Sequence, residues 1–179
     1  MTAPAANEPY ALLARYNRWF NERLYEACET LDDAARKLDR GAFFGSIHRT
    51  LNHLMLADKL WLRRFGTQPG GFRALTDEVL ALPPFTGLDQ QLFEDFDAMR
   101  AHRVQMDAAV EAFIAELTPA FIAAPMTYQT TKGAPFTQPA WQVLSHVFNH
   151  QTHHRGQVTT LLMQAGVDPG PTDLLVITR

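Results

Sequence analysis

The chain has 179 residues, of which 46% are hydrophobic and 20% are charged, and its formal net charge is −3. These values are typical of one folded domain over residues 1–179 with a hydrophobic core, and they argue against wholesale disorder. The 16 Lys and Arg residues are scattered along the chain. Because no basic stripe is available to neutralise a phosphate backbone, we expect no nucleic-acid binding.

The sequence also limits where the protein resides. No apolar run approaches the ~20 residues that a membrane-spanning helix needs, so we expect no membrane partner. The start, MTAPAANEPY, has no basic region followed by an apolar run, and we therefore expect no signal peptide. Cys28 is the one cysteine, which excludes an internal disulfide and a CxxC metal site. Cytoplasmic residence is the remaining expectation.

Apolar residues recur at helical spacing in the first third of the chain. The first predicted helix runs from about Tyr10 to Leu31, and Tyr16, Phe20 and Leu24 lie on its apolar face. The second predicted helix runs from about Phe43 to Phe65. It ends before a glycine and has two arginines in its last turn, where cations suit the negative end of a helix.

A long connection separates the second helix from the third. It extends from Gly66 to about Gly87, is rich in proline and glycine, and has a middle part (72–82) with room for a short helix. A connection this long is unusual in a compact domain and suggests that it covers something. The third predicted helix runs from about Leu88 to Leu117, with apolar side chains at every third or fourth position.

The last third of the chain contains a strand-forming pattern followed by a helical one. Residues 124–139 contain strand formers on both sides of a Lys-Gly turn and predict a small β-hairpin. A fourth helix is predicted from Pro139 or Ala140 to Ala165, and the apolar segment 174–177 of the tail should dock onto the bundle. Four long helices predict an all-α fold, a four-helix bundle with up-down or crossover topology.

Four of the seven histidines lie close together on the fourth predicted helix: His146, His150, His153 and His154. Successive helix residues turn by ~100° and rise by ~1.5 Å, so His150 and His154 point about 40° apart and lie ~6 Å apart along the axis. Two such imidazoles can share one ion, with bonds of ~2.0–2.1 Å for zinc. Their row is otherwise largely apolar, with Val143, Val147, Gln157 and Leu161.

This row predicts that His150 and His154 point into the bundle as metal ligands. His146 and His153 lie in a row of small and polar residues, which suggests a supporting role for His153 and leaves open whether His146 or water is a fourth ligand. The alternative is that all four are ordinary polar or interior histidines. Two histidines hold a metal weakly, so a third ligand from another helix is needed.

The candidates for the third ligand are His48, His53 and Asp58 on the second helix and His102 on the third. His48 and His53 lie on opposite shoulders of the apolar stripe, so periodicity does not choose between them. Asp58 lies at the centre of the stripe, where an unpaired carboxylate would be costly. It must serve the site or form an ion pair, such as one with an arginine of another helix. His102 is the weakest candidate.

Two segments closely resemble the hallmark segments of the DinB family, in the wider DinB/YfiT-like metalloenzyme superfamily. They are TLNHLMLADKLWLRRF (residues 50–65) and LSHVFNHQTHHRGQVTTLL (residues 144–162), and ARYNRWFNERLYEA (residues 14–27) is similar to the family's first helix. The resemblance covers nearly the whole chain. It implies a four-helix bundle, often a homodimer, with a divalent metal held by three histidines. The family's ligands match His53, His150 and His154.

A three-histidine site leaves at least one position open on the ion, which is the pattern of a catalytic site. The resemblance extends to thiol-dependent transferases and isomerases that use bacillithiol or mycothiol. It therefore implies a small-molecule substrate, a low-molecular-weight thiol, and a metal-dependent transferase. A metal-dependent hydrolase is one alternative, and a non-catalytic metal-binding or stress-related bundle is another.

Three further groups are predicted to orient the ligands or the substrate: Asp58, His153 and Gln157. No residue is a clear protein nucleophile, because Cys28 lies beside an apolar face, where cysteines are commonly inert. Imidazole ligands suit several divalent ions. We expect zinc or nickel, with iron or manganese as alternatives.

Overall fold

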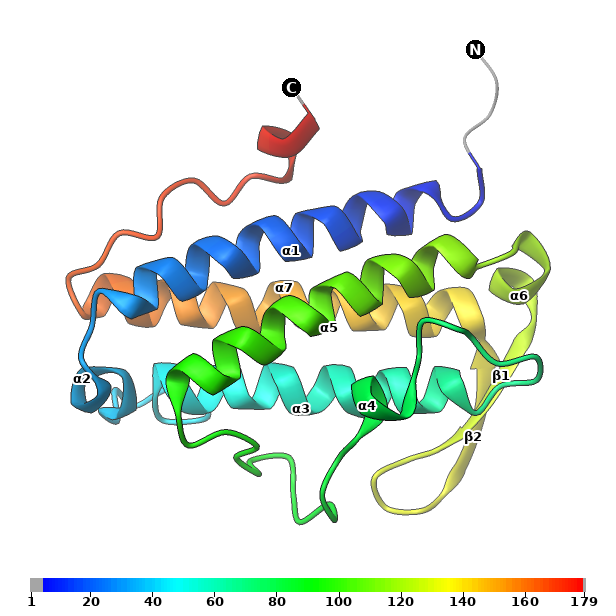
Figure 1. Ribbon diagram of the computed structural model, residues 1–179, viewed down its shortest axis with the longest axis horizontal. Helices are drawn as coiled ribbons and strands as arrows, with labels where there is room; N and C mark the ends of the chain where they lie inside the picture. The colour runs from blue at the N-terminus through cyan, green and yellow to red at the C-terminus, as the bar shows by residue number, and fades with distance from the viewer. Residues whose placement is uncertain (1–4, 179) are drawn as a thin grey trace.

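The protein is a bundle of four long helices. The computed structural model describes residues 5–178, so the first residues of the segment searched for a signal peptide and the last residue of the tail lie outside it. The long helices are α1 (Glu8–Glu29), α3 (Ile47–Gly66), α5 (Phe96–Glu116) and α7 (Ala140–Gln164). The predicted all-α bundle is confirmed (Figure 1).

The order of the helices requires one long crossover. In Figure 1, α1 and α7 run in one direction, whereas α3 and α5 run in the other. The pairs in closest contact are α1 with α5, α1 with α7, and α3 with α7. Because α3 and α5 are consecutive long helices that run in the same direction, the chain must return along the bundle between them. Residues 67–95 make this return and contain the short helix α4 (Asp77–Leu80).

Short elements complete the fold. They are α2 (Asp33–Lys37), α6 (Pro119–Ala123), the strands β1 (Pro125–Gln129) and β2 (Pro135–Pro139), and the 3-10 helix η1 (Leu174–Thr178). The strands pair antiparallel, with Thr127 opposite Thr137, so the predicted hairpin is confirmed. Within residues 5–178, no helix is long and apolar enough to cross a membrane.

Two long helices begin later than their apolar patterns predicted. The side chain of Ser46 accepts a hydrogen bond from the Arg49 amide and caps α3, after Gly45 has turned the chain with a φ of 79°. Asp95 caps α5 in the same way, through the Ala98 amide at 2.8 Å. The apolar residues before each cap therefore belong to loops, and several of them lie beside the histidines described below.

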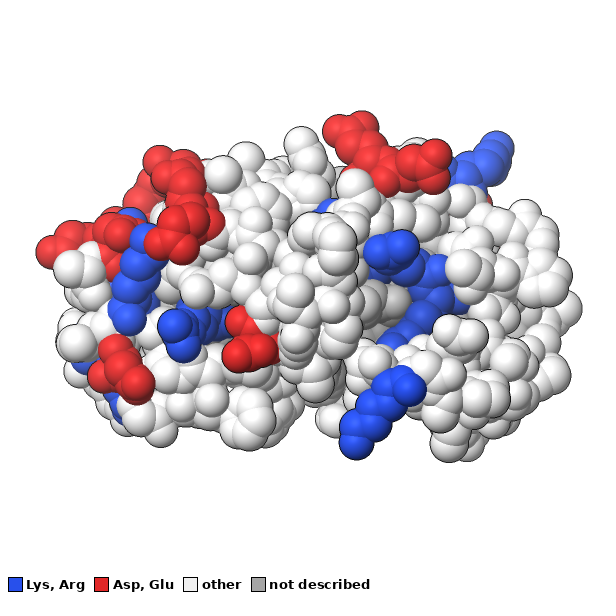
Figure 2. Space-filling model, turned by 90° about the horizontal axis from the view of Figure 1, so that it is seen from below, with Lys and Arg blue, Asp and Glu red and all other residues white. Residues whose placement is uncertain are grey.

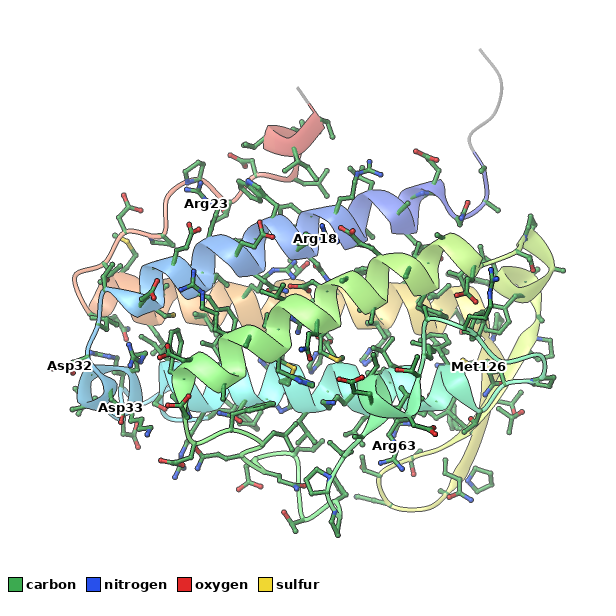
Figure 3. The ribbon with its side chains drawn as sticks, in the orientation of Figure 1. Arg18, Arg23, Asp32, Asp33, Arg63 and Met126 are labelled. Carbon is green, nitrogen blue, oxygen red and sulfur yellow. The ribbon has the colours of Figure 1, made fainter. Side chains whose placement is uncertain are left out.

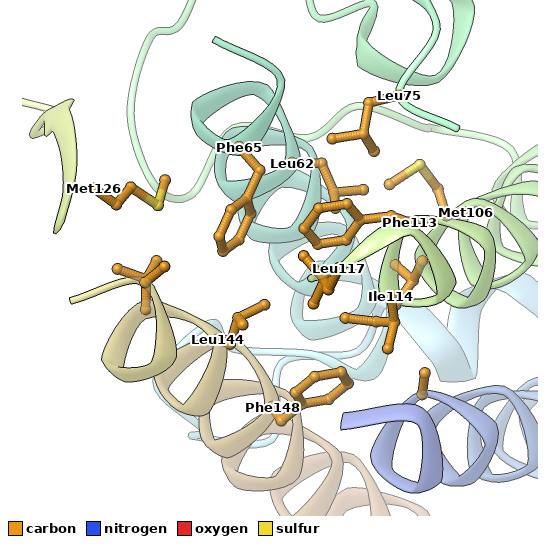
Figure 4. Packing of buried hydrophobic residues seen from close by; sticks show 14 of the residues in the cluster. Leu62, Phe65, Leu75, Met106, Phe113, Ile114, Leu117, Met126, Leu144 and Phe148 are labelled. Carbon is orange, nitrogen blue, oxygen red and sulfur yellow. The ribbon is translucent and has the colours of Figure 1, made fainter. Parts of the chain in front are cut away.

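The hydrophobic core has two parts. The part at the hairpin end includes Phe65, Phe113, Leu144 and Phe148, with Met126 of β1 1% exposed among them (Figure 4). Met126 thereby anchors the hairpin to the bundle. The other part, at the opposite end, is built on α1, α3, α5 and α7. The tail docks there only in part, since Leu174 and Ile177 contact this core, whereas Leu175 and Val176 are exposed.

Buried charged and amide side chains cross the middle of the bundle. Asp58 accepts hydrogen bonds from Arg103 at 2.5 Å and from Gln151, which confirms the predicted ion pair with an arginine of another helix. Arg103 also pairs with Asp107 at 2.9 Å. Arg155 donates to Asn17 and to Gln151, and is itself fully buried. We call this group the buried charge network: Asn17, Asn21, Asp58, Arg103, Asp107, Gln151 and Arg155.

Candidate metal site

Three histidines predicted as ligands lie together between α3 and α7. The Nε2 atom of His150 lies 3.2 Å from Nε2 of His53 and 3.1 Å from Nε2 of His154. One ligand atom from each of these residues lies within 4.8 Å of the others, so the group could hold a metal ion. The antiparallel packing of α3 against α7 creates this arrangement. It places His53 opposite His150 and His154, which lie one helical turn apart on α7.

Hydrogen bonds on the far side of two rings fix which nitrogen faces the cluster. Nδ1 of His53 lies 2.8 Å from the carbonyl oxygen of Leu88, and Nδ1 of His154 lies 2.7 Å from Oε1 of Gln157. Both oxygens can only accept, so each Nδ1 carries the proton, and each neutral ring turns a bare Nε2 lone pair inward. A single proton on His150 could satisfy only one of these lone pairs. A cation would satisfy them all.

The spacing of the nitrogens fits a small divalent ion. A tetrahedral ion with bonds of ~2.0–2.1 Å holds neighbouring ligand atoms about 3.3 Å apart. The two measured Nε2 separations, 3.1 and 3.2 Å, are close to this value. The contacts from Leu88 and Gln157 are of the kind that orients metal-binding imidazoles in proteins.

Burial keeps the three imidazoles in the neutral form that binds metals. Desolvation, together with the smaller effects of the neighbouring His154 and His53, lowers the pKa of His150 to about 3. Desolvation also lowers the pKa of His154 to about 4, although the hydrogen bond that His154 donates to Gln157 opposes this shift, and it lowers the pKa of His53. At neutral pH each ring therefore carries one proton and not two, so each keeps a nitrogen lone pair that can bind an ion.

The histidines open onto a cavity of about 510 Å³. This is within the usual size range of small-molecule sites. Its floor comes from α3 and α7, and hairpin residues Tyr128, Thr130 and Thr131 form one side. A second cavity of about 980 Å³ adjoins it and is bounded by the crossover residues 82–85 and the hairpin. The crossover and the hairpin thus shape the mouth of the site, as expected from the length of the loop.

The structure separates the other candidate ligands from this cluster. His48 is fully buried and its Nε2 lies 2.9 Å from the Phe93 carbonyl oxygen, where it helps to hold the crossover. His102 packs on the Phe93 ring from α5. His146 lines the cavity, but its ring rests edge-on against Trp61, and it does not belong to the three-residue group.

The three predicted supporting residues have different surroundings. Gln157 contacts His154 through Oε1, and its Nε2 lies 3.3 Å from Nε2 of the exposed His153, so these three side chains form a chain. Asp58 forms part of the buried charge network instead of bonding to the histidines. Burial lowers the pKa of His53, and the hydrogen bond to Leu88 and then the charge of Asp58 oppose this shift.

Sequence reasoning missed several groups near the site. The Leu88 carbonyl belongs to a turn at the start of the stretch predicted as the third helix, and no side-chain pattern reveals it. Phe44 stacks on His53 with a centroid distance of 4.0 Å, in a stretch that the apolar pattern assigned to a helix. Gln151 and Arg155 did leave a signal. They occupy a second row on α7 with apolar residues above and below: Leu144, Phe148, Val158 and Leu162.

The fold and the cluster together define a helical bundle with a three-histidine site that could hold a metal ion. The sequence profile of the DinB family matches residues 1–179, so the chain belongs to the DinB family, as its segments predicted. The chain is also similar to "Protein DinB" of Bacillus subtilis (strain 168), with 26% identity over 170 residues, covering 90% of this chain and 88% of that protein. No solved structure gave a significant match.

Proposed function

We propose that this protein is a metal-dependent transferase that activates a low-molecular-weight thiol at His53, His150 and His154. The observation that carries the proposal is the convergence of three Nε2 atoms at the wall of a cavity. A divalent ion held there, zinc or nickel by preference, would supply a positive charge that lowers the pKa of a thiol. Three protein ligands leave room for one more group on the cavity side.

The residues around the cluster support thiol transfer more than hydrolysis. Among the described residues, no Asp or Glu lines the cavity, so no carboxylate is placed to act as a general base toward water. A thiol depends less on such a base, because its ordinary pKa of about 8.5 is far below that of water and its proton can pass to solvent through the open cavity. The sulfur then bonds to an electrophilic carbon, and the leaving group departs with the electron pair of the broken bond.

The chain's own residues would position these reactants. Gln157 and the Leu88 carbonyl hold the His154 and His53 rings in the orientation that directs Nε2 toward the cavity. Phe44 covers the His53 ring and limits water on that side. The apolar and aromatic cavity wall offers a surface for the non-reacting part of a substrate.

The first test is metal content, measured by mass spectrometry on protein purified without a histidine tag. We expect one bound equivalent in the wild type, and loss of the metal in His150→Ala and His154→Ala variants that remain folded. His102→Ala is the matched control and should retain the metal, because His102 lies outside the cluster. A wild type that contains no metal and takes up neither zinc nor nickel would contradict the proposal.

The second test addresses the chemistry. Metal-loaded protein is incubated with an electrophile in the presence and absence of a low-molecular-weight thiol, and thioether formation is followed by mass spectrometry. Product that requires both the thiol and the metal supports a transferase. Conversion that proceeds equally well without thiol would support the hydrolase instead.

A homodimer is also part of the proposal, on the basis of the family resemblance. Exposed apolar side chains such as Met163 and Leu175 offer contact surface outside the cavity. Sedimentation equilibrium at several protein concentrations tests it, and a monomer at all of them would contradict it.

A further inference from the structure

We call the cavity beside the histidines the inner cavity and the adjoining one the outer cavity. Arg64 is the one residue with a permanent charge among the described residues that line the inner cavity. It lies near the C-terminal end of α3 and is half-buried. Its guanidinium carbon lies 4.2 Å from the centroid of Trp61 and 5.1 Å from that of Tyr128. Within residues 5–178, the guanidinium has no hydrogen-bond acceptor and no ion-pair partner.

A half-buried cation without a protein acceptor loses part of its hydration, which has a cost in free energy. Contact with the two aromatic rings offsets part of the desolvation. The N–H donors of the guanidinium reach water and no acceptor among the described residues, and they match a carboxylate or a phosphate. Burial lowers the pKa of Arg64, which reflects the same incomplete compensation.

The position of Arg64 relates it to the histidines. His53, Ala57, Trp61 and Arg64 follow each other at steps of three or four along α3, so they share one face of the helix, and all four line the cavity. Helix side chains lean toward the N-terminus, and the guanidinium accordingly lies back over Trp61, in the direction of His53. The positive charge of Arg64 also lowers the pKa of His146, although less than burial does.

The surrounding charge favours an anion at this end of the molecule. Arg63 and Arg64 both line the adjoining outer cavity, and neither cavity has an Asp or Glu among its described lining residues. In Figure 2, most of the acidic side chains on this face gather over the left half, together with some basic ones, whereas the right half has basic side chains around its middle and an acidic group at its upper edge. Figure 3 shows Arg63 toward the hairpin side of α3, whereas Asp32 and Asp33 lie at the opposite end of the bundle.

We propose that Arg64 is the anchor for an anionic group, a carboxylate or a phosphate, on an elongated small molecule whose other end reaches the three histidines. The part between the two ends would lie along Ala57 and Trp61. The side chain acts as a specificity-determining residue. This inference rests on the proposed function for the identity of the reacting end, but the anion subsite itself requires no metal.

The test uses cobalt(II)-loaded protein, in which a thiolate bound to the ion gives an absorption band in the near ultraviolet. The probes are ω-mercapto carboxylic acids of increasing chain length and the matching ω-mercapto alcohols. We expect affinity for the acids to peak at one chain length and to exceed that for the alcohol by about tenfold or more. In Arg64→Gln the advantage of the acid should disappear, while cobalt content and affinity for the alcohol stay unchanged.

Arg73→Gln is the matched control, because Arg73 is exposed and lines neither cavity. It should retain the preference for the acid. Equal binding of acid and alcohol by cobalt-loaded wild type would overturn the anion subsite and leave the metal site intact. A preference that persists in Arg64→Gln would also overturn the assignment to this residue.

A second measurement separates the two proposals and does not depend on a stable variant. Saturation-transfer NMR on metal-free wild type compares octanoate, octyl phosphate and octanol. Tighter binding of the anions supports the subsite even if cobalt fails to bind, a result that would count against the proposed function alone. The anion that binds more tightly shows whether the group held by Arg64 is a carboxylate or a phosphate. Binding of octanol as tight as that of both anions would overturn the subsite.

Discussion

The bundle contains two groups of polar side chains whose hydrogen bonds are satisfied to different degrees. The buried charge network joins all four long helices, whereas the histidine cluster lies between α3 and α7. In the buried charge network, Asp58, Arg103 and Asp107 supply each other with charges and hydrogen bonds. In the histidine cluster, three neutral rings direct acceptors at one another, and the protein offers no donor to satisfy all of them. Among the described residues, the network satisfies its groups except the Nε atoms of Arg103 and Arg155, which are buried without a partner. The cluster could be completed by a cation.

This difference shows how a helix can combine a stabilising row with a functional row. On α7, Gln151 and Arg155 are 2% and 0% exposed, whereas His150, which directly precedes Gln151 in the chain, is only partly buried. The row that faces the centre of the bundle holds the network. The neighbouring row, at the edge of the buried face, holds the histidines and opens onto the cavity. We therefore expect substitutions in the first row to affect folding, and substitutions in the second to affect metal binding.

The largest expected effect comes from breaking the network. Asp58→Ala leaves buried guanidinium and amide donors without their acceptor and should lower the free energy of unfolding by about 3–5 kcal/mol. Denaturant unfolding of the metal-free protein measures it. Glu29→Gln is the control, because the Glu29–Arg100 pair is partly exposed and should contribute about 1 kcal/mol or less. A similar small loss in both variants would contradict the proposed contrast.

The next largest effect concerns metal-linked stability. Zinc at a hundredfold excess over its dissociation constant should raise the free energy of unfolding by about 2.7 kcal/mol in the wild type. His150→Ala should lose this gain, because two histidines from different helices hold an ion weakly. The metal-free stability of the variant should change far less than that of Asp58→Ala. Thermal unfolding with and without zinc gives both values, and a persistent zinc effect in His150→Ala would refute the cluster as the site.

A smaller effect is expected from the residue that orients His154. Gln157→Ala removes the acceptor of the Nδ1 proton and should weaken metal affinity about 10–100-fold without abolishing binding. Competition with a chromogenic chelator measures the affinity. Gln142→Ala, at an exposed position of the same helix, should leave it unchanged. If both variants bind metal as the wild type does, Gln157 has no orienting role.

The most gradual effect concerns pH. In the folded protein the pKa of His150 is lowered to about 3 and that of His154 to about 4. In the unfolded chain both histidines should have the ordinary pKa of about 6.5. As the pH falls below this value, the unfolded chain therefore takes up protons before the folded chain does. The stability of the metal-free protein should therefore be full above this value and decline between it and pH 4. His150→Gln should show a shallower decline. Parallel curves for both proteins would contradict the assignment.

The sequence predicted the parts of the fold that depend on periodic patterns. The four long helices and the hairpin follow from apolar spacing and turn residues, and the pairing of His150 with His154 follows from helix geometry. Periodicity left His48 and His53 equivalent, and the resemblance to the DinB family chose His53. The packing of α3 on α7 then placed His53 beside the pair and turned His48 toward the crossover.

The remaining features depend on contacts between distant segments. The bond from His53 to the Leu88 carbonyl needs the crossover to follow α3, and the position of Arg64 over Trp61 and Tyr128 needs the hairpin to fold over the helix. Neither relation leaves a repeating pattern in the sequence. The helix starts at Ile47 and Phe96 were missed for a local reason, since apolar residues before the caps continue the helical spacing without being helical.

His53 and His150 are 97 residues apart in the chain, and α7 is the last long helix to be synthesised. A growing or partly folded chain can therefore offer an ion only the local His150–His154 pair, and the third nitrogen becomes available when α7 docks on α3. Loading of the site would follow folding rather than guide it. Once bound, the ion would cross-link two distant segments, and its escape would be limited by how often this helix pair separates.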